Sequence, residues 1–159
     1  LCDRFARIDK QEFGDIKGIT DKGYYDNSFH VSSRINISPF EKLRLEALGH
    51  KYSAGGHISY IETDSLTKNL DAIPDILRYA KSVGIHYMGI NQPVDKCHIC
   101  GYKGEFTATK EGFTCPQCGN HDSNEMSVIR RVCGYLAQPN ARPFNKGKQE
   151  EIMHRVKHS

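Results

Sequence analysis

The sequence predicts an α/β fold that carries a small metal-bound ribbon. Residues 57–90 show a strand pattern, a helix pattern and a second strand pattern in succession, which is the order of a βαβ unit. Residues 97–118 contain two Cys-x-x-Cys pairs on either side of a short linker, the spacing of a four-sulfur metal site. We therefore expect an α/β domain and a metal-bound appendage within the 159 residues.

The first 27 residues contain scattered apolar side chains. Turn signals recur within them at Gly14, Gly18 and Gly23. We predict loops with one or two short strands in this segment.

A helix start follows at Ser38. Ser supplies an N-cap, Pro39 occupies the first helical position, and Glu41 stands three residues after the Ser. Apolar residues then recur at helical spacing up to Gly49, which predicts the end of the helix.

The next three segments form the predicted βαβ unit. Residues 57–62 alternate as a strand does, and residues 66–83 carry apolar side chains along one helical face. Pro74 is expected to divide that helix into two short ones, and Gly84 to end it. Residues 85–90 then form a buried strand. The two strands should be parallel, with a right-handed crossover.

Two histidines, His57 and His86, lie in these predicted strands. Each of them could be a core histidine whose hydrogen bonds are satisfied, or it could bind a metal. We favour core histidines over metal binding, because the sequence shows no second set of ligands.

The two Cys pairs carry the clearest chemistry. A glycine follows each pair and permits the tight turn of a thiolate knuckle, and a hairpin over 105–113 can bring the two knuckles to one ion. Four thiolates suit tetrahedral zinc, with an iron–sulfur centre as the rarer alternative and disulfides or free thiols as the remaining ones. A closed four-sulfur site has no open position, so we interpret the ion as structural. The expected ligands are Cys97, Cys100, Cys115 and Cys118.

The segment after the ribbon is short and apolar. The pattern of residues 127–137 alone predicts a strand that leads into a turn at Gly134. Asn145 is expected to cap a final helix from about 146 to 157.

Charge and composition narrow the function classes. The net charge of +3 is too small to indicate a nucleic-acid partner, although residues 130–159 carry seven Lys or Arg against two Glu. That basic tail fits phosphate or nucleic-acid binding, or simply a solvated face. No apolar run approaches the ~18 residues of a membrane helix, and no secretory signal is visible. Cysteine usage is typical of the reducing cytoplasm. The chain begins at Leu1 without Met, so we expect a piece of a larger polypeptide.

Several motifs in order resemble the C-terminal end of the large subunit of the anaerobic (class III) ribonucleoside-triphosphate reductases. The ribbon is followed by Arg-Val-Cys-Gly-Tyr-Leu at 131–136 and by Asn-Ala-Arg-Pro-Phe-Asn-x-Gly-Lys at 140–148. Gly-Tyr-Tyr-x-Asn-Ser-Phe-His at 23–30 and Gly-Gly-His-Ile-Ser-Tyr at 55–60 extend the likeness over nearly the whole chain. The motif at 131–136 is specific because it follows a ribbon.

The resemblance implies a domain organisation. Residues 1–92 would be the C-terminal part of a ten-stranded α/β barrel of the glycyl radical type. Residues 93–125 would form the zinc-ribbon module, and residues 126–159 the glycyl radical loop and C-terminal helix.

The resemblance also implies the chemistry. Gly134 would carry a glycyl radical, installed by an iron–sulfur activating enzyme that uses S-adenosylmethionine, with Arg131 and Tyr135 positioning the loop. The radical would oxidise a cysteine to a thiyl, which abstracts the ribose 3′ hydrogen; the 2′ hydroxyl leaves as water and formate supplies electrons. In the family the thiyl cysteine and the allosteric nucleotide site lie upstream of the matched region. Cys133 and Cys2 are therefore not assigned that role, and the fragment alone is expected to be inactive.

The expected partners follow from the same likeness. They are the rest of the large subunit, the activating enzyme, ribonucleoside triphosphate substrates, nucleotide effectors and a second copy in a homodimer, with no membrane and no nucleic acid.

Two alternatives come from other classes. A zinc-ribbon nucleic-acid-binding module with a basic tail would use Lys103, Phe106, Lys110 and Phe113 on the hairpin for phosphate contacts and stacking. A small repair protein that donates a spare glycyl radical domain would also be short, but such proteins lack a ribbon before the Gly motif.

Overall fold

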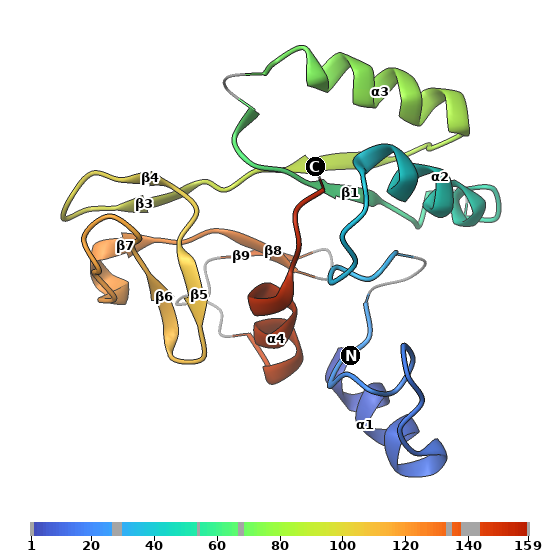
Figure 1. Ribbon diagram of the computed structural model, residues 1–159, viewed down its shortest axis with the longest axis horizontal. Helices are drawn as coiled ribbons and strands as arrows, with labels where there is room; N and C mark the ends of the chain where they lie inside the picture. Colours follow the sequence, from blue (N-terminus) through green and yellow to red (C-terminus); the bar gives the residue numbers. More distant parts are fainter. Residues whose placement is uncertain are drawn as a thin grey trace. The chain divides into compact units, whose positions relative to one another are not determined.

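The chain alternates helices and strands that group into two units in the computed structural model (Figure 1). Residues 1–27 and 93–155 form one unit, which we call the cysteine unit because it contains the four clustered cysteines. Residues 28–92 and 156–159 form the other, which we call the βαβ unit. Among the described residues, no helix has the length and apolar character needed to cross a membrane. The structure describes residues 2–26, 30–53, 55–66, 69–132, 135–137 and 144–158.

The cysteine unit begins with a helix, α1 (Cys2–Phe13), where the sequence analysis expected loops and short strands. That prediction is wrong. The segment is rich in residues of high helix propensity, and Gly14 ends the helix with φ 75° while its N–H donates to the Lys10 carbonyl at 3.0 Å. Phe5 and Ile8 stand at helical spacing, a signal that the sequence analysis missed, and both side chains are exposed in this structure.

The βαβ unit starts with α2 (Pro39–His50), which begins as predicted. The Ser38 Oγ accepts a hydrogen bond from the Glu41 N–H at 3.2 Å, and Pro39 occupies the first turn. The helix ends at His50, one residue beyond the predicted Gly49, which is within the usual uncertainty of a helix end.

Two parallel strands, β1 (Ser59–Glu62) and β2 (Met88–Asn91), are joined through α3 (Ala72–Val83), which confirms the predicted βαβ order and the parallel pairing. Pro74 does not divide the helix, contrary to the prediction. It is the third residue of α3, where an N–H has no intrahelical partner to lose, so the helix simply starts later. Gly84 ends α3 with φ 87°.

The core of the βαβ unit lies between its helices and strands. Leu43 of α2, Ile61 of β1, and Ile76 and Ala80 of α3 are buried together, and Met88 of β2 packs against them. Figure 1 shows α3 running alongside the β1–β2 pair. Burying a Leu or Ile side chain contributes about 1.5–3 kcal/mol, so this cluster holds the helices on the strands.

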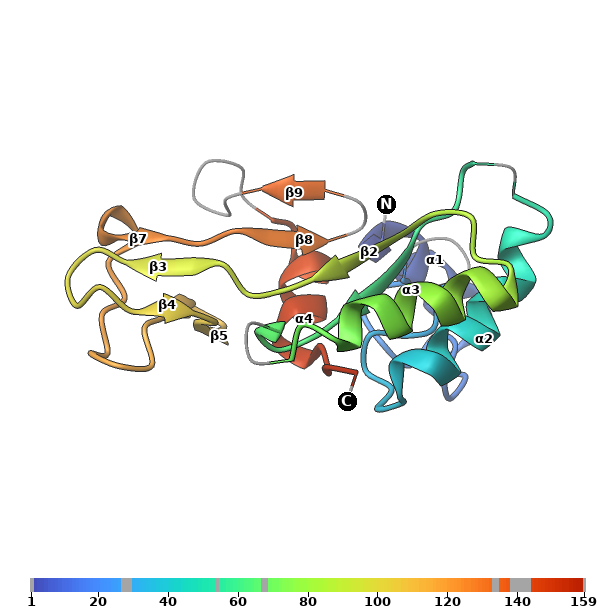
Figure 2. The same ribbon diagram turned by 90° about the horizontal axis from the view of Figure 1, so that it is seen from above.

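The strands in the described part of the cysteine unit form three small sheets. The predicted hairpin between the two Cys pairs is present as the antiparallel pair β5 and β6. In the three-stranded sheet β3 lies between β4 and β7, as Figure 2 shows. The elements are β3 (Asp95–Cys97), β4 (Lys103–Gly104), β5 (Thr107–Thr109), β6 (Gly112–Thr114), η2 (Ser123–Glu125) and β7 (Met126–Ser127).

The cysteine unit closes with an antiparallel pair, β8 (Arg130–Val132) and β9 (Tyr135–Ala137), and the helix α4 (Lys146–His154). The Asn145 Oδ1 accepts a hydrogen bond from the Lys148 N–H at 3.0 Å, which confirms the predicted cap. The helix ends at His154, earlier than the predicted 157, because Arg155 has extended backbone angles.

Candidate metal centre

Each Cys pair is built into a tight backbone turn. The Gly101 N–H donates to the Cys97 carbonyl at 3.1 Å, and the Gly119 N–H donates to the Cys115 carbonyl at 2.9 Å. Both glycines have positive φ, 76° and 71°, a region that residues with a Cβ rarely occupy. The predicted glycine-closed knuckles are therefore present.

The four thiols converge on one point. The Sγ atoms of Cys97 and Cys118 are 3.7 Å apart and those of Cys100 and Cys115 are 3.6 Å apart. All four sulfurs lie within 4.8 Å of one another, and all four residues are free cysteines. Tetrahedral zinc with Zn–S bonds of about 2.3 Å has S–S edges of about 3.8 Å. The cluster can therefore hold a metal such as zinc.

The thiols cannot all ionise without a cation. Backbone hydrogen bonds, first from Cys100, lower the pKa of the Cys97 thiol to about 6. A backbone hydrogen bond from Tyr102 lowers the pKa of Cys100, but burial and the neighbouring sulfurs outweigh it and raise that pKa to about 12. The pKa of Cys118 is also raised. A bound divalent ion would compensate the charge of four adjacent thiolates, which supports a metal at this site.

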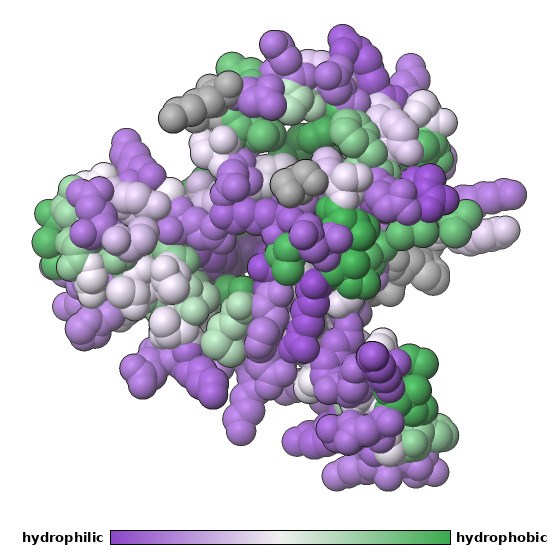
Figure 3. All heavy atoms as spheres, viewed as in Figure 1, coloured by the Kyte–Doolittle hydropathy of each residue, from purple (hydrophilic) through white to green (hydrophobic). Residues whose placement is uncertain are grey.

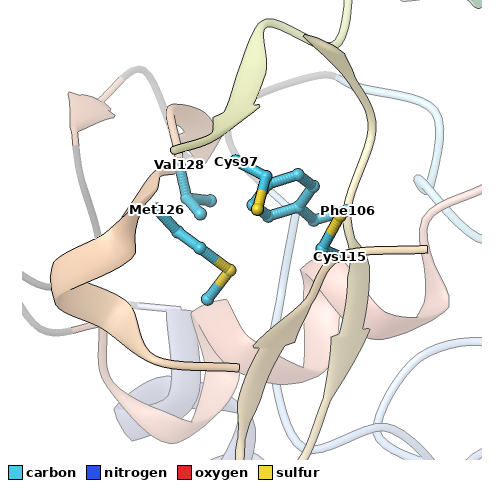
Figure 4. Close-up of a cluster of buried hydrophobic side chains, with 5 residues drawn as sticks. All are labelled: Cys97, Phe106, Cys115, Met126 and Val128. Atoms are coloured by element: carbon cyan, nitrogen blue, oxygen red, sulfur yellow. The ribbon is translucent and has the colours of Figure 1, made fainter. Parts of the chain in front are cut away.

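A hydrophobic cluster surrounds the inner pair of sulfurs. Cys97 and Cys115 are buried with Phe106, Met126 and Val128, and Figure 4 shows these five side chains gathered together. They come from both knuckles, from the hairpin and from the segment after it. Ordering the thiols therefore also orders the packing of the segments around them.

The Asp95 side chain connects Phe106, which precedes the β5–β6 hairpin, to the start of β8. Its carboxylate accepts hydrogen bonds from the backbone N–H groups of Phe106 at 2.8 Å and Ile129 at 3.2 Å, and it forms an ion pair with Arg130. Arg130 also donates to the Phe106 carbonyl at 3.3 Å, and its guanidinium lies 5.1 Å from the centre of the Phe113 ring. Both charged side chains are buried. Removing one would leave the other charge uncompensated.

The β8–β9 pair begins at Arg130. The two strands are in antiparallel register, with Val132 opposite Tyr135. Cys133 and Gly134, between the strands, lie outside the described residues, so the role of Gly134 stays a prediction. The Arg131 carbonyl accepts a hydrogen bond from Arg155 at 2.8 Å, which links β8 to the residue after α4.

The βαβ unit contains a second group of possible metal ligands, which the sequence analysis missed. His30, Glu46 and His57 each offer a ligand atom, and these atoms lie within 4.8 Å of one another. His57 is buried, as expected for a core histidine, whereas His86 is exposed, so the core interpretation is wrong for His86. The sequence offered only an indirect signal, the spacing of four between Lys42, Glu46 and His50, which places them on one face of α2; the structure shows that this face is buried.

The electrostatics of this second group centre on Glu46. Its Oε1 contacts the Lys42 ammonium, accepts a hydrogen bond from the Val31 N–H at 2.9 Å and lies 3.5 Å from His30 Nδ1. Burial raises the pKa of Glu46, but His30 and Lys42 outweigh it and lower the pKa to about 2. Burial and the neighbouring His30 lower the pKa of His57. The carboxylate is therefore ionised in the folded protein.

Comparisons with known proteins match nearly the whole chain to one protein family. The model of the anaerobic ribonucleoside-triphosphate reductase family matches residues 1–158. Proteins of that name from Escherichia coli strain K12 and from Enterobacteria phage T4 are each 51% identical over 158 residues, which is 99% of this chain. The chain spans 22% of the length of the E. coli relative and 26% of the phage relative.

A solved structure of an anaerobic ribonucleotide reductase has a similar fold. The match has a TM-score of 0.70 at 21% sequence identity and covers 99% of this chain and 23% of that one. The mixture of helices and strands described above is therefore an arrangement that also occurs within a much longer reductase chain.

Proposed function

Because the chain belongs to the anaerobic ribonucleoside-triphosphate reductase family, we propose that it is the radical-bearing C-terminal part of the large subunit of such an enzyme. The enzyme reduces ribonucleoside triphosphates to deoxyribonucleoside triphosphates with formate as reductant, in the cytoplasm. The observation that carries the proposal is the family match over residues 1–158, which include the motif at 131–136.

Gly134 stores the unpaired electron. An iron–sulfur activating enzyme that uses S-adenosylmethionine removes one Cα hydrogen and leaves a planar carbon between an electron-donating amide nitrogen and an electron-withdrawing carbonyl. Both neighbours delocalise the electron, and the lack of a Cβ removes the clash that planarity would bring. The glycyl radical then takes the thiol hydrogen of a cysteine elsewhere in the large subunit, and the resulting thiyl abstracts the ribose 3′ hydrogen.

The metal centre anchors the segment that carries Gly134. Cys97, Cys100, Cys115 and Cys118 hold a structural zinc ion, whose binding supplies folding free energy on the order of 10 kcal/mol. The contacts of Asp95 with the hairpin and with Arg130 support this role, because they connect the packed knuckles to the first residue of β8. All four ligand positions are filled by sulfur, so the ion takes no part in the reaction.

The rest of the large subunit surrounds this chain. Residues 1–92 complete a ten-stranded α/β barrel with upstream segments, residues 93–125 form the zinc ribbon, and residues 126–159 form the radical loop and final helix. Figure 3 shows hydrophobic side chains on the surface over α1, where Phe5 is 51% and Phe13 is 67% exposed. An exposed apolar face of this kind supports burial against further parts of the subunit. Nucleotide substrates and effectors bind mainly outside this chain, and the large subunit pairs with a second copy in a homodimer.

The packing of the hairpin aromatics argues against the alternative of a nucleic-acid-binding ribbon. Phe106 is only 2% exposed within the cluster around the thiols, and the Phe113 ring faces the Arg130 guanidinium. The Phe106 ring is therefore not available for stacking with bases, which a ribbon of that class requires, and the partly buried Phe113 already has a cationic neighbour.

The proposal is tested by activating the whole large subunit anaerobically and recording its electron paramagnetic resonance spectrum. We expect a carbon-centred doublet from the wild type and from the Cys133→Ser control, and none from Gly134→Ala. A wild-type protein that acquires no organic radical, or a Gly134→Ala variant that keeps the doublet, would contradict the proposal. A normal radical yield after zinc removal would contradict the anchoring role alone.

A further inference from the structure

Three separate segments of the βαβ unit bring metal-binding side chains to one place. His30 lies in the irregular segment that precedes α2, Glu46 lies in the third turn of that helix, and His57 lies two residues before β1. Their ligand atoms are within 4.8 Å of one another, and the two imidazole rings are 5.0 Å apart between centroids. This spacing is close enough for the three groups to hold one metal ion, with small side-chain shifts giving bonds of about 2.0–2.2 Å.

Glu46 has an oxygen available for such an ion. Its Oε1 is engaged by Lys42 and by the Val31 N–H, whereas Oε2 has no hydrogen-bond partner among the described residues. Both oxygens belong to a side chain whose exposed fraction is 0%. A buried carboxylate oxygen without a partner is costly, and coordination of a cation removes that cost without displacing Lys42.

We propose that His30, Glu46 and His57 form a second metal site, which binds a divalent first-row transition ion and is best matched by Zn²⁺. Two imidazoles and one carboxylate are the donor set of zinc sites that keep a fourth position open. Mg²⁺ and Ca²⁺ prefer ligand shells of oxygen alone, so they fit this donor set poorly.

The nearby ammonium sets the strength of the site. Lys42 lies against the same carboxylate and repels a cation, while the side chains described as packing around the thiols include Phe106, Met126 and Val128. We therefore expect the second ion to bind more weakly than the first and to be removed first by a chelator. Occupancy ties the segment at His30 to α2 and to the start of β1. This inference does not depend on the radical chemistry proposed above.

The test measures the metal content of the whole protein after equilibrium dialysis against Zn²⁺. We expect two equivalents per chain for the wild type, one for His30→Gln and one for Cys97→Ser, each variant having lost a different ion. His30→Gln is preferred to a Glu46 variant because it leaves the buried Lys42–Glu46 pair intact. His86→Gln is the matched control, since His86 is near the same cluster, 6.0 Å from the His50 ring, but outside the ligand set. It should keep two equivalents.

A second measurement identifies which site holds which ion. Loading with Co²⁺ gives an intense sulfur-to-metal absorption from the thiolate site alone, so His30→Gln should keep that absorption and Cys97→Ser should lose it. The proposal is overturned if the wild type binds a single equivalent, if His30→Gln keeps both, or if His86→Gln loses the second ion as completely as His30→Gln does.

Discussion

The two ligand clusters of this chain differ in how their charge is balanced. In the cysteine unit a backbone hydrogen bond from Tyr102 lowers the pKa of Cys100, but burial and the neighbouring sulfurs outweigh it and raise that pKa, so a cation favours ionisation of all four thiols. In the βαβ unit Glu46 is ionised beside Lys42 and needs no ion to be neutralised. The four-thiol cluster therefore needs a metal to balance its charge. The His30–Glu46–His57 cluster keeps its arrangement without a metal and can bind one in addition.

The clusters also differ in what surrounds them. The thiols pack against Phe106, Met126 and Val128, which come from short strands and turns with little other core. The βαβ unit has a separate apolar core built on Leu43 and Ile61. Small units with little buried apolar surface rely on metals for stability. The following predictions, from the largest effect to the smallest, test this contrast.

Loss of zinc should unfold the cysteine unit and spare the βαβ unit. Cys97→Ser or complete chelation removes a binding free energy on the order of 10 kcal/mol, more than a small ribbon can replace. Hydrogen exchange of the whole protein should show the amides of β3 and β7 losing protection while those of β1 and β2 keep it. Equal loss of protection in both units would show that their stabilities are not separate.

Asp95→Asn should destabilise the cysteine unit by about 3–5 kcal/mol, because it leaves the buried Arg130 without a counter-charge. Chemical denaturation followed through the metal site measures this effect. Asp75→Asn is the control: it breaks an ion pair with Arg78 in which the Asp75 side chain is 65% exposed, and should change stability by less than about 1 kcal/mol. Similar effects of the two changes would rule out a special role for Asp95.

Leu43→Ala should destabilise the βαβ unit. The side chain is fully buried in the βαβ core, so its truncation should cost about 2–5 kcal/mol. We expect earlier thermal unfolding of β1 and β2 with unchanged zinc content at the thiolate site. Loss of that zinc would indicate coupling between the two units.

Gly119→Ala should have the smallest effect, about 1–2 kcal/mol on the cysteine unit. A Cβ at this position meets no atom within 4 Å, so the cost is that of the backbone conformation at φ 71° alone. Gly56→Ala is the matched control, because the space there is equally open and no positive φ is imposed. Zinc dissociation rates measure the difference; a knuckle unaffected by Gly119→Ala would show that the turn tolerates a side chain.

Local features were predictable from the sequence. The caps at Ser38 and Asn145 and the Cys-x-x-Cys turns depend on residues within a few positions of one another, and all three are present in the structure. The helix α1 was missed because the glycine turn signals at its end and beyond were given more weight than the helical spacing of Phe5 and Ile8.

Long-range features were not predictable in the same way. The approach of His30 to Glu46 and His57 depends on how the chain folds back on itself, and no spacing in the sequence encodes it. The ion pair of Asp95 with Arg130 joins residues 35 positions apart and has the same cause. The role predicted for Gly134 came from resemblance to a family, because a single glycine carries no distinguishing pattern of its own.

The most direct test of the central claim is to expose the anaerobically activated protein to air and determine its fragments by mass spectrometry. If Gly134 stores the radical, the backbone should break at that residue and release the segment that begins with Tyr135, in the wild type and not in Gly134→Ala. An activated protein that stays intact in air, or one that is cleaved elsewhere, would contradict the account.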